Sequence, residues 1–196
     1  MGRVPDLREV LRARLDQDPR PVADPGDRLA AVLALLIETP EPALLLTERS
    51  RALRRHAGEV SFPGGLREPA DPNLQATALR ETEEEVGIDR TVPELLGALP
   101  PVHTTVSGIL VTPFVGVVRA LPTLGVGDGE IVRVLTASMR TLSEVEHERM
   151  YPRPGGGIWR GWVYEVDGVT VWGATGSMVH ALMDIVRKET PWLIQP

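Results

Sequence analysis

The stretch Arg80-Glu81-Thr82-Glu83-Glu84-Glu85-Val86-Gly87-Ile88 decides the fold class of this 196-residue chain. It closes a segment of helical composition that runs from Asn73 to Val86. The segment stops at Gly87, a residue that commonly terminates helices because it tolerates a left-handed backbone. The sequence therefore predicts a helix whose second half is unusually rich in glutamate.

Three carboxylates share one face of this predicted helix, within an arc of about 100° at about 100° per residue: Glu81, Glu84 and Glu85. The side that we expect to face the core carries Leu79, Thr82 and Val86. Crowded carboxylates repel one another by a few tenths of a kcal/mol per pair, and the helix dipole disfavours anions near the C-terminal end. A divalent cation removes both penalties, because hard cations take oxygen ligands. A solvated acidic face is the alternative interpretation of the same pattern.

Composition limits the function classes that fit. The hydrophobic fraction of 42% supports a buried core, and the net charge of -6 argues against an overall basic nucleic-acid binder. Cysteine is absent, which excludes disulfides and thiolate metal sites, and Lys188 is the only lysine, so an anion site would use arginine. No apolar run reaches the ~20 residues of a membrane-spanning helix, and no signal peptide is evident. We expect a cytoplasmic protein with one domain over residues 1–196.

The remaining segments predict strands with helices at both ends of the chain. We expect a helix over about 6–16 and a closing helix from Ala174 to Lys188, and a further short helix from Thr141 to Arg149. The region from Gly64 to about Pro72 should be a loop. The predicted strands are Leu29–Ile37, Ala43–Thr47, Gly58–Phe62, Glu94–Val102, Ile109–Val118, Glu130–Leu135, Ile158–Val166 and Val169–Trp172, the last two joined at Asp167-Gly168. The fold class is α/β or α+β, a mixed sheet with packed helices.

The acidic stretch resembles the Nudix box, G-x5-E-x7-R-E-U-x-E-E-x-G-U, where U is aliphatic. The second half matches in order at Arg80, Glu81, Glu84, Glu85, Gly87 and Ile88, with Thr82 at a U position. The first half departs from the pattern, because one extra residue separates Gly65 from Arg80. The first acidic position then falls on Asp71, or on Pro72 when counted back from Arg80. The resemblance implies a Nudix fold, an α+β sandwich in which a mixed β-sheet is flanked by helices and the box forms a loop, a helix and a loop.

The same resemblance implies roles for the box residues. Glu81 and Glu85 match the usual ligands of Mg²⁺ or Mn²⁺. Glu84 matches a residue that binds a further cation or helps to deprotonate water, and Arg80 matches one that supports the loop through its carboxylates. A guanidinium that holds a carboxylate in a fixed pose and a cation that activates water are consistent with these roles. Arg80 and Glu84 are thus the candidate catalytic residues, and Glu81, Glu84 and Glu85 the candidate metal ligands.

The segment from Leu45 to Gly65 resembles the signature of the coenzyme A (CoA) pyrophosphatase branch, L-L-T-x-R-S-x3-R-x3-G-x3-F-P-G-G, at every fixed position. The resemblance extends roughly from Leu29 to Arg187. It implies hydrolysis of the pyrophosphate of CoA to 3′-phospho-AMP and 4′-phosphopantetheine. The candidate substrate-binding residues are Arg49, Arg54, Arg55, His56, Gly64 and Gly65. Arg51 is better explained as solvated, and packing under the loop is an equal alternative for His56.

Other functions stay open at this point. A Nudix pyrophosphatase acting on ADP-ribose, NADH or a (d)NTP has the same box, and a non-catalytic Nudix domain would bind a ligand or a protein. His103 has no second histidine at ligand spacing, so a metal site there is not favoured. The four tryptophans could stack on adenine, but such residues in a hairpin are more often core or dimer interface. We expect a small CoA-type nucleotide as the partner, neither nucleic acid nor membrane, and a homodimer as one candidate assembly.

Overall fold

The computed structural model describes residues 6–39, 41–52, 57–104, 108–125, 129–152 and 156–194, with the side chain of Trp159 left out. The helices are α1 (Leu7–Arg14), α2 (Leu74–Val86), α3 (Met139–Val145), α4 (Gly173–Glu189) and a short 3₁₀ turn, η1 (Pro191–Leu193). The strands are β1 (Arg28–Ile37), β2 (Ala43–Arg49), β3 (Val60–Ser61), β4 (Gly64–Leu66), β5 (Glu94–Ala98), β6 (Val102–Thr104), β7 (Ile109–Val118), β8 (Ile131–Ser138), β9 (His147–Pro152), β10 (Ile158–Val166) and β11 (Val169–Val171).

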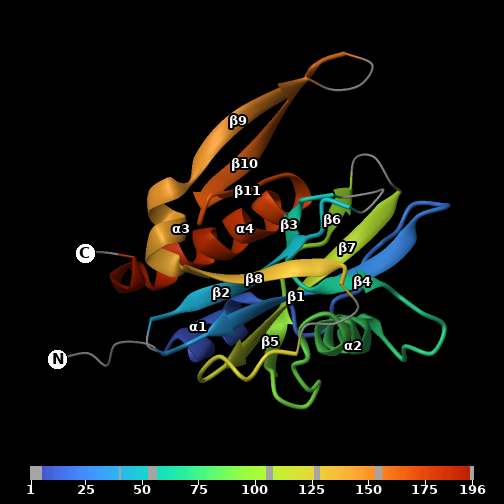
Figure 1. Ribbon diagram of the computed structural model, residues 1–196, viewed down its shortest axis with the longest axis horizontal. Coiled ribbons are helices and arrows are strands. Elements are labelled where there is room, and N and C mark those ends of the chain that lie inside the picture. The colour runs from blue at the N-terminus through green and yellow to red at the C-terminus, as the bar shows by residue number, and fades with distance from the viewer. Residues whose placement is uncertain are drawn as a thin grey trace.

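A mixed eight-stranded sheet forms the centre of the fold (Figure 1). Its main path runs β3-β2-β1-β7-β5, while β4 pairs with β1, β6 with β7 and β8 with β2. The pair β1 and β7 is parallel over ten residue pairs, from Arg28↔Ile109 to Ile37↔Val118. Both strands are long apolar runs, as expected for strands that are buried on both faces. The mixed sheet with packed helices confirms the predicted fold class.

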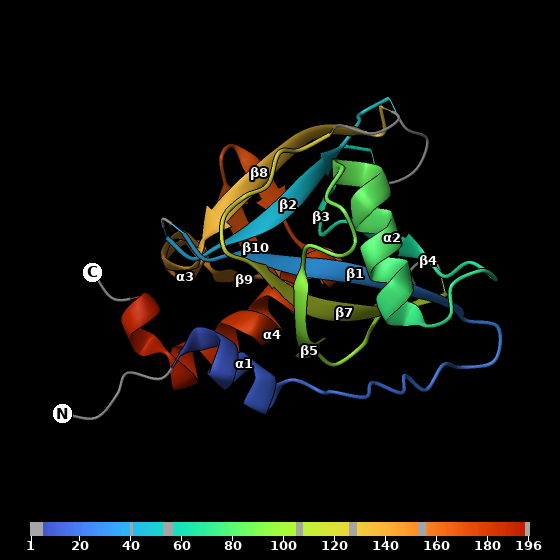
Figure 2. The same ribbon diagram turned by 90° about the horizontal axis from the view of Figure 1, so that it is seen from below.

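Alternate residues of β1 serve two separate cores. Val32 and Leu36 face the larger core, which also holds side chains of α1, α4 and the second sheet. Leu33 and Leu35 face the smaller core, where Ala78 and other residues of α2 pack. Figure 2 shows α2 on one side of β1 and β7, with α1 and α4 near the other. The sheet therefore separates the glutamate-rich helix from the helices at the two ends of the chain.

Local signals in the sequence account for α2. The Asn73 side chain accepts a hydrogen bond from the backbone N–H of Ala76 at 2.9 Å and caps the helix. Gly87 closes it in the left-handed conformation, with φ 71°. Thr82 and Val86 are buried and Leu79 is half-buried, as the periodicity predicts. The helix prediction from Asn73 to Val86 is confirmed.

Several predicted boundaries were wrong. Residues 147–149, predicted as the end of a helix, belong to strand β9, because they pair with β10 at positions distant in sequence. The predicted strand from Glu94 to Val102 is two strands, interrupted at Pro100 and Pro101, which have no N–H to donate to a sheet. Gly64–Leu66 lies in strand β4 and not in a loop, because its backbone pairs with β1.

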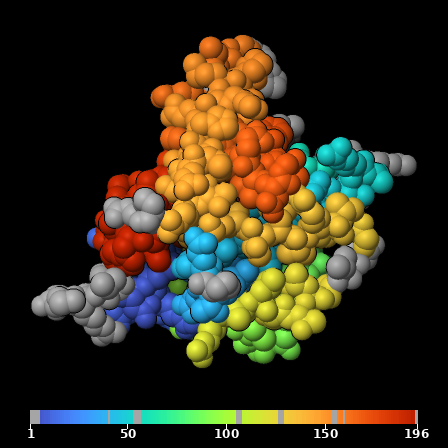
Figure 3. Space-filling model, turned by 60° about the vertical axis from the view of Figure 1, so that its left-hand side comes forward, coloured from blue at the N-terminus to red at the C-terminus, as the bar shows by residue number. Residues whose placement is uncertain are grey.

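A three-stranded sheet of β11, β10 and β9 carries a long hairpin that stands away from the body (Figures 1 and 3). At its base, the Trp162 ring stacks on His180 of α4, with ring centroids 3.7 Å apart. Glu146 joins this contact, since it accepts from Tyr164 and pairs with Arg187 at 3.0 Å. These interactions tie the hairpin to α4. No helix in the described parts of the chain is long and apolar enough to cross a membrane.

Candidate active site

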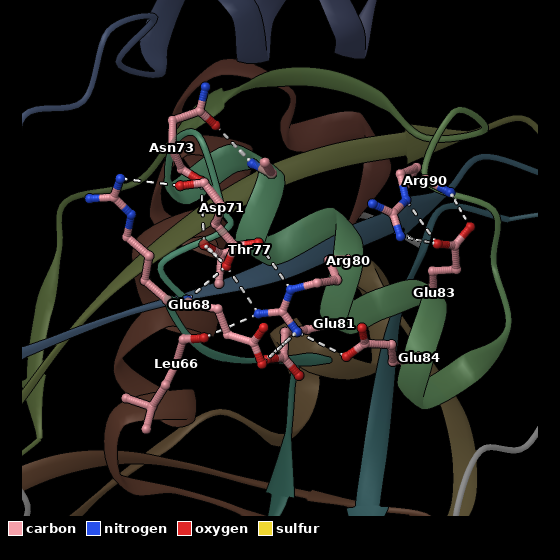
Figure 4. A network of polar contacts seen from close by, with 12 residues as sticks. Leu66, Glu68, Asp71, Asn73, Thr77, Arg80, Glu81, Glu83, Glu84 and Arg90 are labelled. Atoms are coloured by element: carbon pink, nitrogen blue, oxygen red, sulfur yellow. Dashed lines mark hydrogen bonds and ion pairs between the residues drawn. The ribbon is translucent and has the colours of Figure 1, made fainter.

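The Arg80 guanidinium organises the residues before and along α2 (Figure 4). Its Nε and Nη2 donate to the two oxygens of Asp71 at 3.0 and 3.1 Å, and Nη2 also donates to the backbone oxygen of Leu66 at 3.2 Å. Its Nη1 lies 2.9 Å from a Glu84 oxygen and 3.0 Å from a Glu81 oxygen. A planar guanidinium can hold a carboxylate through two parallel hydrogen bonds in this way.

Asp71 fills the first acidic position of the box in spite of the inserted residue. It is buried, at 6% exposure. Besides Arg80, it accepts from the Thr77 hydroxyl and from the Glu68 backbone N–H, each at 2.9 Å. The Arg80 guanidinium holds the pKa of Asp71 well below its ordinary range, against the opposing effect of burial. The sequence left this position open between Asp71 and Pro72, and the structure gives it to Asp71.

Glu81 and Glu85 lie against the two glycines of β4. The backbone N–H of Gly64 donates to Glu85 at 3.2 Å. A Cβ atom on Gly65 would lie 2.5 Å from the Glu81 carboxyl carbon, closer than real contacts allow. Any side chain at Gly65 would therefore have to displace the Glu81 carboxylate. Gly64 and Gly65 thus lie directly against the two acids.

Burial disfavours the charged forms of both acids. It raises the pKa of Glu85 to about 7, although the Gly64 N–H and the Arg49 guanidinium oppose this effect. Burial likewise raises the pKa of Glu81, with Arg80 opposing it. Half-buried carboxylates of this kind are hard oxygen donors, which suit a divalent cation. Their side chains are 18% and 15% exposed, for Glu81 and Glu85 respectively, so a small ion has access to them.

Glu84 is more exposed than Glu81 and Glu85. Its side chain is 54% exposed and pairs with Arg80. Among the described side chains, the group of three whose donor atoms lie within 4.8 Å of one another is Asp24, Asp27 and His103. The three box glutamates are farther apart than that. Asp27 holds that group together, because it accepts from the Asp24 N–H at 2.9 Å and lies 3.5 Å from His103 of β6.

Of the predicted substrate-binding arginines, Arg49 reaches the acids. It ends β2, and its Nη1 lies 3.7 Å from a Glu85 oxygen. Its Nη2 donates to Glu130 at 2.7 Å. Sequence reasoning missed Glu130, which follows a Gly/Pro segment with no motif. Arg51 is exposed, as expected. Arg54, Arg55 and His56 lie outside the described residues.

Comparison with known proteins agrees with this arrangement. The sequence profile of the NUDIX domain matches residues 27–153. The chain is 37% identical over 183 residues to a protein of Photorhabdus laumondii named uncharacterized Nudix hydrolase NudL, a match that covers 93% of this chain and 97% of that protein. A protein of the same name from Escherichia coli is 39% identical over 177 residues, covering 89% of this chain and 88% of the relative.

Solved structures share the fold. A NUDIX hydrolase from Alicyclobacillus acidocaldarius superposes with a TM-score of 0.50 at 19% identity, over 64% of this chain and 84% of that one. A MutT/nudix family protein from Enterococcus faecalis superposes with a TM-score of 0.51 at 15% identity, over 94% of this chain and 69% of that one. The chain therefore belongs to the Nudix family. It is a Nudix hydrolase, a pyrophosphohydrolase of small nucleotide-type substrates in a family that generally uses divalent metals.

Proposed function

We propose that this Nudix hydrolase cleaves the pyrophosphate of CoA and its derivatives. The products would be 3′-phospho-AMP and 4′-phosphopantetheine. The supporting observation is the position of Arg49, a fixed residue of the CoA-type signature, whose guanidinium lies 3.7 Å from Glu85 of the Nudix box. A residue of the signature and a residue of the box that are distant in sequence thus lie close together in the fold.

The proposed chemistry assigns each group a separate task. Glu81 and Glu85 would hold Mg²⁺ or Mn²⁺, which neutralises the pyrophosphate and lowers the pKa of bound water. Glu84, which is exposed beside them, would hold a further cation or accept the proton of the attacking water. Arg80 keeps Glu81 and Glu84 in place through contacts of 3.0 and 2.9 Å. Water attacks one phosphorus, the bridging P–O bond breaks, and the other phosphate leaves.

Arg49 has an unused donor that suits a phosphate. Its Nε is buried and has no hydrogen-bond partner among the described residues. A buried polar atom without a partner is uncommon, and an anionic oxygen would satisfy it. CoA carries a 3′-phosphate on its ribose, apart from the pyrophosphate. We propose that Arg49 binds that phosphate, together with Arg54, Arg55 and His56 of the same segment, while Gly64 and Gly65 line the pyrophosphate side.

Product analysis tests the substrate. The protein is incubated with CoA and Mg²⁺ or Mn²⁺, and the products are separated by chromatography and identified by mass spectrometry. We expect 4′-phosphopantetheine and 3′-phospho-AMP, and no turnover in EDTA. ADP-ribose, NADH and a (d)NTP are run in parallel. Faster hydrolysis of one of these would favour the other Nudix pyrophosphatases, and no hydrolysis of any of them would favour a non-catalytic domain.

A comparison of CoA with dephospho-CoA tests the role of Arg49. A partly exposed charge-assisted hydrogen bond is worth about 1.5–3 kcal/mol at most, so Arg49→Ala should lower kcat/KM for CoA by ~10–150-fold. The rate on dephospho-CoA, which lacks the 3′-phosphate, should hardly change. Arg51→Ala is the matched control, because Arg51 is exposed in the same segment. Equal losses on both substrates would show that Arg49 serves the pyrophosphate or the acids instead.

A further inference from the structure

Arg49 lies between two carboxylates at unequal distances. Its Nη2 contacts Glu130 at 2.7 Å, a normal hydrogen bond, while its Nη1 is 3.7 Å from Glu85. The Glu130 contact is therefore a direct charge-assisted hydrogen bond, whereas the Glu85 contact is only a charge interaction at longer range. The Arg49 guanidinium is thus held by Glu130. Its distance to the Glu85 oxygen is one ångström longer than its distance to the Glu130 oxygen.

The backbone explains why Glu130 is in position to do this. Strands β2 and β8 pair along their whole length, but the register shifts between Glu48 and Arg49. Glu48 pairs with Arg133 and Arg49 with Ile131, so Val132 is the extra residue of a β-bulge. The Ser50 N–H then donates to the Glu130 backbone oxygen at 2.7 Å. The bulge thus brings Glu130 beside the end of β2, where the Arg49 side chain emerges.

A guanidinium in direct contact with Glu85 would interfere with cation binding there. It would occupy carboxylate lone pairs that a metal needs, and its positive charge would repel the ion. In the proposed function Glu85 binds a cation and Arg49 binds an anion. Both can do so only if their side chains are kept apart. Glu130 can separate them, because it holds the Arg49 guanidinium through a direct hydrogen bond.

We propose that Glu130 is a positioning residue that holds the Arg49 guanidinium off Glu85 and so leaves the Glu85 carboxylate open to a divalent cation. This inference rests on the metal-binding role proposed for Glu85, and it does not depend on the identity of the substrate. Without Glu130, Arg49 turns to Glu85, and the cation must compete with it.

A double-mutant cycle on Mn²⁺ binding tests the proposal. Binding is measured on the full chain from the electron paramagnetic resonance signal of free Mn²⁺, with no substrate present. Glu130→Gln should raise the Kd for Mn²⁺ by about five-fold, the scale of one partly exposed ion pair. In an Arg49→Met background the same change should have little effect, because the competing guanidinium is gone. Far-ultraviolet circular dichroism checks that each variant is folded.

Glu48→Gln is the matched control. Glu48 precedes Arg49 on β2 and pairs with Arg133 of β8, at 3.1 Å. The control removes one negative charge and one β2–β8 ion pair but does not touch Arg49, so the Kd for Mn²⁺ should stay close to that of the unmodified protein.

Two results would overturn the inference. If Glu130→Gln does not change Mn²⁺ binding, Glu130 has no such role. If it weakens binding equally with and without Arg49, Glu130 acts on the cation directly. A separate measurement tests the proposed metal site. If Glu85→Gln leaves Mn²⁺ binding unchanged, both the metal site and this inference are wrong. If the cycle behaves as expected but CoA is not hydrolysed, only the substrate proposal fails.

Discussion

Glu85 is a half-buried carboxylate that keeps its proton up to a higher pH than an ordinary glutamate. Its pKa rises to about 7 from an ordinary value of 4.5, mainly because it is desolvated. The ionised group therefore destabilises the metal-free fold at pH values above 4.5, and this penalty is complete above pH 7. A bound cation would remove it. A carboxylate kept in such a place is costly for stability, as expected for a group that serves function.

The first prediction follows from the raised pKa of Glu85. In EDTA at pH 8, Glu85→Gln should raise the free energy of unfolding by at most about 3 kcal/mol, the equivalent of the pKa shift. The gain should vanish below about pH 3.5, where the carboxyl is protonated in both states. With Mn²⁺ present, the same variant should lose orders of magnitude in kcat. Urea unfolding at the two pH values and steady-state kinetics measure these effects. A variant less stable than the parent at pH 8 would contradict the argument.

The pKa of Asp71 is shifted in the opposite direction to that of Glu85, and this shift supports the second prediction. Its pKa is lowered, so the ion pair with Arg80 stabilises the fold above pH 3.8, and this stability is lost as the pH falls below that value. Asp71→Asn leaves the half-buried Arg80 with one partner fewer, so we expect a loss of about 2–4 kcal/mol at pH 7. Metal binding should weaken as well, because Arg80 also holds Glu81.

The control for Asp71 is another carboxylate of an ion pair, at the surface. Asp184 pairs with Lys188 one helical turn away, at 2.6 Å, and both side chains are well exposed. Asp184→Asn should cost no more than about 0.5 kcal/mol. Thermal unfolding compares the two variants. Equal losses would mean that burial of the Asp71 pair contributes nothing.

At the scale of elements, the short strand β4 connects the sheet to the acidic helix. It pairs with β1 through Ala30↔Leu66, Ala31↔Gly65 and Val32↔Gly64, and it faces α2 on its other side. Gly64 has a φ of 155°, and a Cβ atom there would overlap the Ala31 backbone oxygen. Backbone atoms cannot move aside as a flexible side chain can. The close approach of β4 to β1 therefore depends on glycine.

The third prediction compares two glycines with positive φ. Gly64→Ala adds backbone overlap to dihedral strain and should cost more than about 3 kcal/mol, or prevent folding. Gly168→Ala, in the β10–β11 turn at φ 76°, meets nothing within 4 Å and should cost only the strain, about 1–2 kcal/mol. Urea unfolding and soluble yield give the comparison. Similar losses for both would show that the overlap at Gly64 is relieved by movement.

At the scale of the whole molecule, the β9–β10 hairpin stands away from the body (Figures 1 and 3). A two-stranded ribbon without a third strand or a packed face is marginally stable in water. Met150 and Ile158 are nevertheless 60% and 65% exposed. The sequence from 147 to 160 contains three arginines and one glutamate, whereas the whole chain has a net charge of -6. We propose that this basic, apolar arm makes the homodimer contact, because it can pair with negative charge on a second copy.

The fourth prediction tests that assembly. Light scattering during gel filtration should give the mass of a dimer for the unmodified chain, and Met150→Glu combined with Ile158→Glu should shift it to a monomer. Val22→Glu is the control, since Val22 is 86% exposed elsewhere on the surface. A monomer at every concentration would exclude the homodimer. Nucleic acid that co-purifies with the protein would indicate instead that the arm binds an anionic partner.

The sequence alone determined the parts that depend on near neighbours. The helix α2 follows from Asn73, its apolar positions and Gly87, because caps and periodicity act within four residues along the chain. The β10–β11 turn follows in the same way from Asp167-Gly168, where Asp167 has a φ of 49°. The box glutamates were found because a motif is itself a local pattern.

Tertiary structure decided what depends on distant partners. Residues 147–149 have no local pattern that favours a strand, and they form one because β10 pairs with them. Whether Asp71 or Pro72 would meet Arg80 could not be read from a count of residues, because the fold of the inserted loop sets that contact. Glu130 reaches Arg49 only through a bulge between two strands that lie about 80 residues apart in sequence. Such contacts are set by the packing of the whole sheet, which no short window of sequence records.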